Sequence, residues 1–513
     1  MSIATRGGWR NERIGILGVL GWPQLAFLGL AALPPLIAVQ QGAWARAGAW
    51  LAVWVVLALI VVVPIHERPA WRWFTHGVLH LAGRATQAAQ WEAAAAVQPL
   101  SREQAGQLDL PGTLQGFKVF DGPPYAAGAM RRLCVLKDPD SAWVMVAKVQ
   151  HPGLSLTDPD AGDRWADALG DLLSAVSRGN SLPHRVSIYV RTVPDDGAER
   201  SAWLEKHSPT VVGGVPIPEQ VLKDTAAVEQ SVLSASVGHE IYVALRFRED
   251  EISGQAKGSG RGVAGRMAVM YRSLPEITSL LTGCGAESVT WMTKGEVAAA
   301  VRTGFNPAAL QSIQVARAAA AQGHEAFTDV HPVAAGPSAA PSPNARFYAH
   351  DNYRSAAYSL ILPELGTTVG SLGPLLTPGA RGERRSLALH YEPFDDKAAT
   401  KAAESDSANA SLAEDLKKRR GFKVGARQTR LRQQTTSQEK ILAAGHTLTR
   451  VTGIAVVTVP ASQPLETHTA LLEASARRRK FELMRLDLAQ PIGFISGCIP
   501  VGVGMPARRG LRK

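Results

Sequence analysis

Two long apolar stretches near the N-terminus constrain this chain more than any other feature. Residues 14–39 and residues 47–65 contain no charged side chain, and each stretch is long enough to cross the roughly 30 Å hydrocarbon core of a bilayer as a helix. Pro34 and Pro35 predict a kink or an early end in the first span, because proline lacks the backbone N–H that a helix interior needs. Only residues 40–46 join the spans, so we predict an antiparallel transmembrane hairpin.

The charges beside the two spans predict the orientation of this hairpin. Short cytoplasmic loops keep Lys and Arg, whereas short translocated loops largely lack them. The bend carries Arg46 alone, while the outer flanks carry Arg6, Arg10, Arg13, Arg68, Arg72 and Arg84. We therefore expect both chain ends in the cytoplasm and the protein in the inner (cytoplasmic) membrane. A buried core hairpin and a cleaved signal peptide are the less favoured alternatives.

The cysteines fit a cytoplasmic location. Cys134, Cys284 and Cys498 are odd in number, far apart and without a CxxC pair. Reduced thiols are the expected state of such cysteines, and a cysteine-based zinc site is disfavoured because no two thiols are close enough in sequence to begin one.

The rest of the chain predicts an α+β fold in two cytoplasmic lobes with split βαβ-like units. Residues 1–100 would hold the hairpin and an amphipathic juxtamembrane helix at 71–96. We place the first lobe at 108–325 and the second at 346–505. Residues 329–345 are rich in Pro, Ala, Ser and Gly, and we predict a linker there.

Hydrophobic periodicity assigns the elements within the lobes. We predict strands at 130–137, 142–150, 185–193, 239–247, 287–292, 348–362, 386–391, 447–459 and 482–488. We predict helices at 163–178, 218–236, 264–281, 295–303, 307–321, 367–375, 395–444 and 465–480. Strands in pairs with helices between them are typical of related βαβ units.

Three groups of residues invite a catalytic or ligand-binding interpretation, and none fits the chemistry. The glycine-rich residues 254–266 contain Lys257, but Gly258 follows it where a nucleotide loop needs Ser or Thr. His76 and His80 share a helix face, yet no third metal ligand follows closely. The acidic residues Asp138, Asp140, Asp195 and Asp196 stand beside Pro and Gly, where turn formation is their usual role. We expect no catalytic residue, no cofactor and no metal site.

The strongest charge feature is a basic cluster in a chain whose formal net charge is +11. It is the candidate lipid- or partner-binding site and consists of Lys417, Lys418, Arg419, Arg420, Lys423, Arg427, Arg430 and Arg432. Smaller clusters lie at 477–480 and 508–513. Basic clusters near an anchored domain are typical of a solvated face or of attraction to the anionic inner leaflet. Nucleic-acid contact is a further possibility without support, and a stacking platform for single strands is disfavoured because Phe422 is the only aromatic residue in the main cluster.

Several short sequences carry a family resemblance. They are AESVTWMT at 286–293, FNP at 305–307, LHYEP at 389–393 and GFISGCIPVG at 493–502. Together with the hairpin, they resemble a family of actinobacterial membrane proteins encoded with conjugation and type IV secretion machinery. The soluble part of that family is similar to the N-terminal domain of the conjugation ATPase, and its hairpin is similar to the small two-span inner-membrane subunit that partners that ATPase.

The resemblance implies a scaffold without a motor. An apolar segment followed by a Pro-Gly turn precedes the motor domain of the ATPase, and Pro500 and Gly502 stand close to the end of this chain, where such a motor would begin. No P-loop pattern occurs in the sequence, so ATP hydrolysis is not implied.

We therefore expect a membrane protein that is not an enzyme, that docks a separate secretion ATPase and other inner-membrane subunits, and that forms an oligomer. Three alternatives stay open. They are a component of a type VII-like secretion complex, a membrane-anchored enzyme such as a transferase, and a DNA-binding coupling protein.

Overall fold

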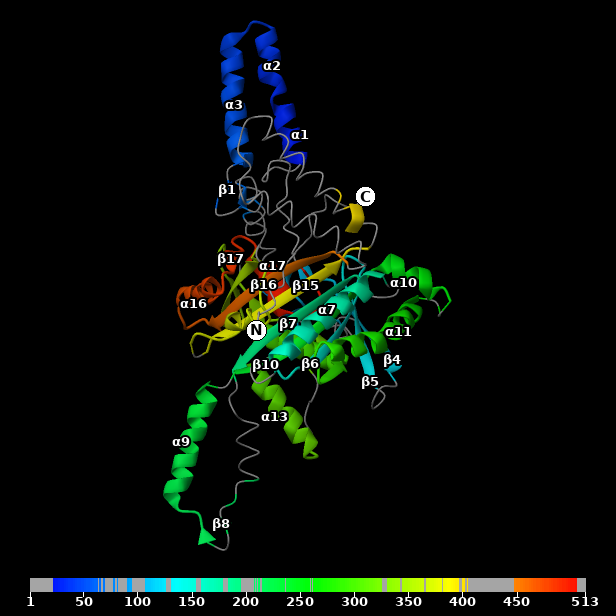
Figure 1. Ribbon diagram of the computed structural model, residues 1–513, viewed down its shortest axis with the longest axis vertical. Coiled ribbons are helices and arrows are strands. Elements are labelled where there is room, and N and C mark those ends of the chain that lie inside the picture. The colour runs from blue at the N-terminus through cyan, green and yellow to red at the C-terminus, as the bar shows by residue number, and fades with distance from the viewer. Residues whose placement is uncertain are drawn as a thin grey trace.

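An 11-stranded antiparallel sheet lies at the centre of the computed structural model (Figure 1). The structure describes residues 22–62, scattered positions from 64 to 94, 107–125, 131–153, 158–178, 183–194, 207–258 with short gaps, 260, 262–324, 330–404 with short gaps, and 447–504. Helices and strands alternate along this part of the chain, so the prediction of an α+β fold is confirmed.

The sheet runs through segments that are distant in the sequence. Its order is β13 (Tyr348–His350), β14 (Tyr353–Ile361), β16 (Thr449–Pro460), β15 (Arg384–Pro393), β7 (Arg185–Pro194), β10 (Val237–Phe247), β6 (Trp143–Gln150), β5 (Arg131–Lys137) and β4 (Lys118–Tyr125). Two further strands pair outside this path, β11 (Ser288–Trp291) with β6 and β17 (Glu482–Arg485) with β14. Central strands such as β6 and β16 are nearly continuous apolar runs, because helices cover both faces of the sheet.

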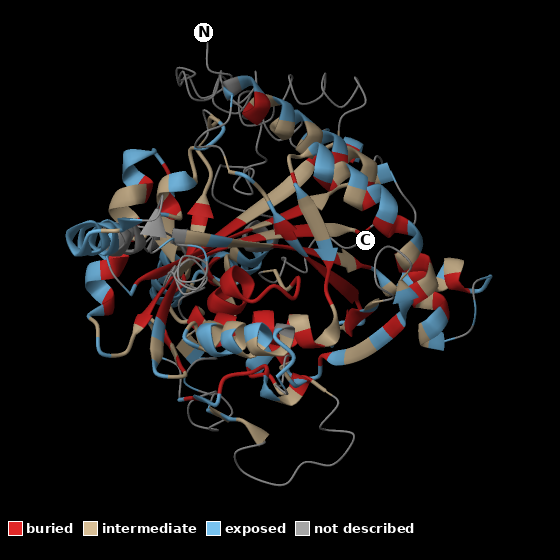
Figure 2. Cartoon of the chain, turned by 90° about the horizontal axis from the view of Figure 1, so that it is seen from below, coloured by how far each residue is buried: buried red, intermediate tan, exposed pale blue. Residues whose placement is uncertain are grey.

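Helices form a layer on each side of the sheet, and the buried residues lie between the layers (Figure 2). One face carries α12 (Lys294–Phe305) and α17 (Gln490–Cys498), whose apolar side chains form a single core across the whole sheet. On the other face, α7 (Pro159–Arg178), α10 (Glu249–Ala256) and α11 (Gly262–Gly283) cover one half of the sheet. The second half of that face lies under α16 (Leu465–Arg478) and the 3₁₀ turn η3 (Gly373–Leu375).

The two halves of the sheet repeat one topology. The strands of the first half follow one another in the chain as β6, β7, β10 and β11, and they lie in the sheet in the order β11–β6–β10–β7. The strands of the second half follow one another as β14, β15, β16 and β17, and they lie in the corresponding order β17–β14–β16–β15. In both halves the fourth strand therefore lies beside the first. Single hydrogen bonds recur as well, since Met292 N–H donates to Val146 O at 3.0 Å and Leu486 N–H donates to Ala357 O at 2.9 Å. The halves are therefore alike in strand order and in register.

The halves meet where β7 pairs with β15. Tyr189 pairs with Ala388 at the centre of this contact, and Ser187 pairs with His390 on one side of it. On the other side Arg191 pairs with Ser386, and an approximate twofold axis through the centre relates this pair to Ser187 and His390. The two predicted lobes therefore contribute to one sheet, and their division into domains stays a prediction.

Residues 330–341, within the predicted linker, pack onto the body of the protein. They contain the 3₁₀ turn η2 (Pro332–Ala334) and the strand β12 (Ala339–Ala340), and Pro332, Ala335 and Ala340 are buried. β12 pairs with β3 (Trp91–Glu92), at the end of the region predicted as a juxtamembrane helix. Most of that region lies outside the described residues, as does nearly all of the helix predicted at 395–444.

Two predicted elements within the second lobe are wrong. Residues 348–362 form a hairpin instead of one strand, because Asp351 and Asn352 take φ values of 42° and 63° and make a two-residue turn. Residues 367–375 are helical only in η3, since Gly370 takes a φ of 80° that a helix does not allow.

Apolar helices form the N-terminal end of the described chain (Figure 1). By length and composition, one helix among the described residues can cross a membrane, at Trp44–Val61 in α3 (Trp44–Val62). The preceding apolar segment consists of α1 (Trp22–Ala31) and α2 (Leu33–Gln40), which are interrupted at Ala32 just before Pro34 and Pro35. Trp54 Nε1–H of α3 donates to Leu28 O at 2.9 Å, so this segment lies beside α3. The predicted pair of spanning helices stays a prediction, because residues 1–21 lie outside the described chain.

Gly497 gives a stability test of the core between α17 and the sheet. A Cβ there would lie 2.5 Å from Val456 Cγ2 and 2.8 Å from Ile454 Cγ2, and both are stiff side chains of a central strand. We expect Gly497→Ala to lower the free energy of unfolding by about 1–3 kcal/mol through overpacking. The midpoint of urea unfolding of the solubilised chain measures this change.

Gly254 is the matched control, because a Cβ there meets nothing within 4 Å in α10. Gly254→Ala should raise the midpoint, since alanine is favoured over glycine within a helix by up to about 1 kcal/mol. A shift in the same direction for both variants would contradict the close packing of α17.

Candidate docking groove

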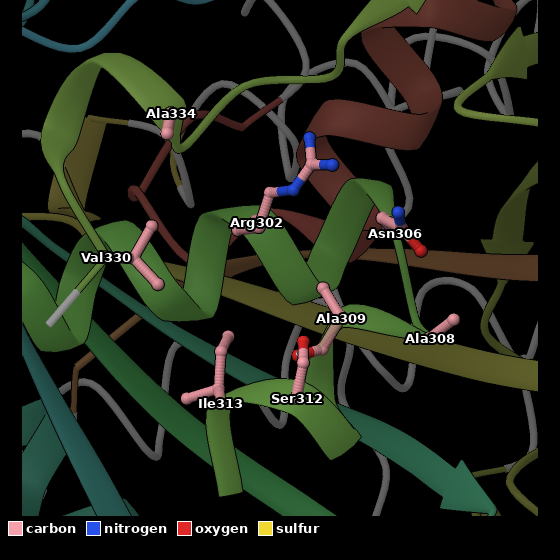
Figure 3. Close-up of a pocket in the computed structure, with 8 residues that line it drawn as sticks. All are labelled: Arg302, Asn306, Ala308, Ala309, Ser312, Ile313, Val330 and Ala334. Carbon is pink, nitrogen blue, oxygen red and sulfur yellow. The ribbon is translucent and has the colours of Figure 1, made fainter. Parts of the chain in front are cut away.

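A groove of about 450 Å³ lies between α12, α13 (Ala309–Ala321) and η2 (Figure 3). Apolar side chains form most of its surface, with a few polar groups at its rim. The lining residues are Arg302, Asn306, Ala308, Ala309, Ser312, Ile313, Val330 and Ala334. These residues come from three segments of the chain.

The sequence at the end of α12 opens this groove. α12 begins with a capping box, in which Thr293 N–H donates to Glu296 Oε2 at 2.9 Å and Thr293 Oγ1 accepts from Glu296 N–H at 3.4 Å. It ends at Asn306, whose extended backbone (φ −126°, ψ 93°) is the conformation expected before Pro307. α13 then starts in a new direction, and the wedge between the two helices becomes the groove.

Arg302 holds the outer wall of the groove in place. Its Nη1 donates to Gly336 O at 2.6 Å and to Asp351 Oδ2 at 2.9 Å. Asp351 in turn accepts a hydrogen bond from Ser338 N–H at 2.7 Å. The guanidinium therefore binds residues 336–338 to the turn between β13 and β14, and it is not available as a free cation.

The remaining polar group of interest is Asn306. Its Oδ1 is buried and has no hydrogen-bond partner within the described part of the chain. An unpaired buried acceptor is costly, and almost none of the surface of this oxygen is exposed to a molecule in the groove. Largely apolar walls are suited to binding a side chain of a partner, and the lining residues include no carboxylate, histidine or cysteine that could serve as an acid, a base or a nucleophile.

A buried polar cluster lies behind the groove, on the inner side of α12. Arg191 is fully buried and its Nη1 donates to Ala300 O at 2.7 Å, near the C-terminal end of α12. Its Nη2 donates to Glu240 Oε2 at 2.9 Å, to Tyr242 Oη at 3.0 Å and to Thr303 Oγ1 at 3.1 Å. A cation at a helix C-terminus is favoured by the helix dipole, so Arg191 stabilises α12 and the groove wall.

A second guanidinium reinforces the same helix end. Arg384 of β15 is buried and donates from Nη1 to Thr303 O. Burial by itself would raise the pKa of Glu240, but Arg191 and Arg384 act against it and hold the pKa below its ordinary value. Glu240 is therefore a carboxylate that compensates the charge of Arg191 and Arg384.

His350 is the neutral member of the cluster. Its Nδ1 lies 2.6 Å from Phe305 O, and its Nε2 lies 2.8 Å from Ser355 Oγ. Burial and, to a smaller extent, the Arg384 charge lower the pKa of His350 to about 3, although the Phe305 carbonyl acts against them. The ring therefore donates from Nδ1 and accepts at Nε2 at neutral pH.

The residues singled out in the sequence lie elsewhere or outside the described chain. The basic cluster at 417–432, residues 508–513, His76, His80, Asp195 and Asp196 are not among the described residues. Asp138 is buried in the turn between β5 and β6, accepts from Ala142 N–H at 2.7 Å and pairs with Arg246, so its role there is structural. Arg266 of the glycine-rich segment pairs with Glu249 of α10.

Two of the three cysteine thiols have a raised pKa. Cys134, Cys284 and Cys498 are free thiols, and Cys134 and Cys498 are buried. Burial raises the pKa of Cys134, and it raises the pKa of Cys284 to about 11. Neither of these two thiols is a thiolate at neutral pH, so neither is an activated nucleophile.

Sequence reasoning did not find the groove. The FNP sequence at 305–307 marked the break after α12, but the opposite wall comes from residues 330–334, which the sequence predicted to be a linker. The buried cluster carried a clearer signal, because Arg191 interrupts an apolar strand. In comparisons with known proteins, no family model and no curated protein matches the chain.

The ion pair of Arg191 and Glu240 gives a test of the buried cluster. Arg191→Met would leave the Glu240 carboxylate buried without its main partner, so we expect it to lower the free energy of unfolding by about 3–5 kcal/mol. Urea unfolding measures the change. Arg191→Met/Glu240→Gln should regain part of the loss, because the buried charge is then removed.

Lys223→Met is the control, since Lys223 and Glu219 form an exposed ion pair that is expected to contribute about 0–1 kcal/mol. Equal effects of Arg191→Met and Lys223→Met would contradict the assignment of Arg191 to a buried, stabilising position.

His350 predicts a pH dependence of stability. Its pKa is about 3 in the folded protein against 6.5 ordinarily, so between these values the unfolded chain binds a proton that the folded chain does not. Stability is therefore lost as the pH falls below about 6.5, by up to about 1.4 kcal/mol per pH unit. We expect His350→Gln to flatten the dependence between pH 6 and pH 4 in urea titrations.

His324 is exposed and serves as the control histidine. His324→Gln should leave the slope unchanged. An unchanged slope in His350→Gln would show that His350 is not the buried neutral group.

Proposed function

We propose that this protein is a non-catalytic, membrane-anchored scaffold of a type IV secretion or conjugation apparatus that docks a separate ATPase. Its finer architecture in this proposal is a transmembrane hairpin with both ends in the cytoplasm, followed by two cytoplasmic lobes built from split βαβ-like units. Its partners are the membrane, the secretion ATPase and other inner-membrane subunits, and it works as an oligomer.

The groove is the observation that carries the proposal. It offers apolar contacts from Ile313 and Val330, while Arg302 is already bound within the protein. Such a lining favours recognition of a protein segment over chemistry on a small substrate. The ATPase is chosen as the partner from the family resemblance, since the chain has no nucleotide-binding loop of its own.

The fold supports the anchor and the lobes. α3 has the length and composition of a spanning helix, and α1 and α2 run beside it. Each half of the sheet follows the strand order of a split βαβ unit, with α7 and α11 between the strands of the first half. A scaffold of this kind would present its lobes to soluble partners while the anchor holds it at the secretion channel.

Co-purification tests the proposal. The tagged full-length chain would be solubilised from its native membrane, and the P-loop ATPase of the same secretion machinery would be quantified by mass spectrometry. We expect the ATPase with the wild-type chain and at least about a tenfold loss with Ile313→Asp, because a charge in the groove opposes burial of an apolar partner.

Val315→Asp is the matched control on the same helix, because Val315 is 61% exposed and is not among the groove residues. It should retain the ATPase. Absence of any secretion ATPase from the wild-type sample would overturn the proposed function, and retention by Ile313→Asp would overturn the groove as its docking site.

A further inference from the structure

An arm between β7 and β10 projects from the sheet at the end opposite the apolar helices α1 to α3 (Figure 1). Its described elements are the short strands β8 (Val211–Val212) and β9 (Val215–Pro216) and the helix α9 (Glu219–Ala235). Figure 1 shows α9 standing away from the layers of the protein. The arm is therefore the part of the described chain farthest from the predicted membrane anchor.

One exposed face of α9 is apolar. Every side chain from Pro218 to Val228 is exposed, and the exposed fractions of Val221, Leu222 and Val228 are 49%, 44% and 62%. Val221, Thr225 and Val228 follow one another at helical spacing, so they define one face of α9, with Leu222 beside it. Val215 of the adjoining β9 is also 66% exposed.

The described side chains of α9 are not buried against the rest of the protein. α9 has 17 residues, little more than the length of about 12–15 residues below which isolated helices are marginal in water, and most helical stability in proteins comes from packing. The described side chains of α9 do not supply that packing, since none from Pro218 to Val228 is buried. Its amphipathic face is suited to pairing with another amphipathic helix.

The charges of α9 define what that helix must carry. Its sequence has three carboxylates, Glu219, Asp224 and Glu229, against Lys223 alone, which gives a net charge of −2. Lys223 Nζ is already 2.8 Å from Glu219 Oε1, so its charge is compensated within the helix. The polar border of the apolar face is thus acidic, in a chain whose formal net charge is +11.

This charge disfavours the two simplest occupants. Helices that lie on membranes are rich in Lys and Arg, whereas α9 is acidic and lies at the far end of the molecule from α3. A second copy of α9 would bring two acidic helices together, and like charges beside a helix interface are destabilising.

We propose that α9 docks an amphipathic helix of a partner protein whose apolar face is bordered by Lys or Arg. Val221, Leu222 and Val228 make the apolar contact, and the acidic border of α9 selects the partner by charge. This contact is separate from the groove and does not rest on the ATPase as its occupant.

Designed peptides test the proposal with the full-length chain in detergent. The probes are two helical peptides of about three heptads with Leu at the core positions, one with Lys and one with Glu at the flanking positions. We expect the Lys peptide to bind at least about tenfold more tightly than the Glu peptide, and its affinity to fall with added salt. The positive net charge of the whole chain would favour the Glu peptide, so a preference for the Lys peptide reports on α9.

Val221→Asp/Val228→Asp is the test variant, and it should weaken binding of the Lys peptide at least about tenfold. Because both side chains are exposed, the variant should keep the circular dichroism spectrum and the urea midpoint of the wild type. Val315→Asp on α13 is the matched control and should bind as the wild type does.

Each other outcome overturns the proposal. Equal binding of the two peptides, or no binding of the Lys peptide, would remove the charge-selected partner. If analytical ultracentrifugation showed that the wild type self-associates and that Val221→Asp/Val228→Asp does not, α9 would be an interface between copies of the chain.

Discussion

The antiparallel pairing of β7 with β15 is the contact on which the rest of the structure depends. It joins two similar halves into one sheet, and it does so through polar side chains that must be paired once they are buried. His390 Nδ1 lies 2.8 Å from Ser187 Oγ across this contact, and Arg385 N–H donates to Thr192 Oγ1 at 2.7 Å. Because these bonds form only in one register, they also align the helices that cross the joint.

The ends of α12 and α17 meet above this joint, and buried charge holds them there. Arg191 reaches Ala300 O of α12 at 2.7 Å and Cys498 O of α17 at 3.4 Å, so one guanidinium contacts both helices. Arg384 adds a second contact to α12, and Glu240 compensates part of the charge. These contacts also hold the α12 wall of the groove in place, because Arg302 and Asn306 of the groove lie on the outer side of the same helix end.

The two halves differ most in the segments that connect their second and third strands. β7 and β15 are antiparallel, so these connections leave the sheet at opposite ends. One connection carries the acidic arm with α9, and the sequence of the other carries the basic cluster at 417–432.

Local pattern was enough to predict most single elements, because helix and strand periods are properties of short segments. The alternating or continuous apolar runs of β6 and β10, the amphipathic stripe of α16 and the turn at Asp138 all follow from neighbouring residues. The helix α17 was missed, since Gly493 and Gly497 fit there only through close contact with Leu486 and Val456. The sequence by itself determined an apolar N-terminal region and an α+β body. Only the tertiary structure decided that β7 pairs with β15, that residues 330–334 form a wall beside α13 and that α9 stands apart, because each depends on contacts between residues far apart in the chain.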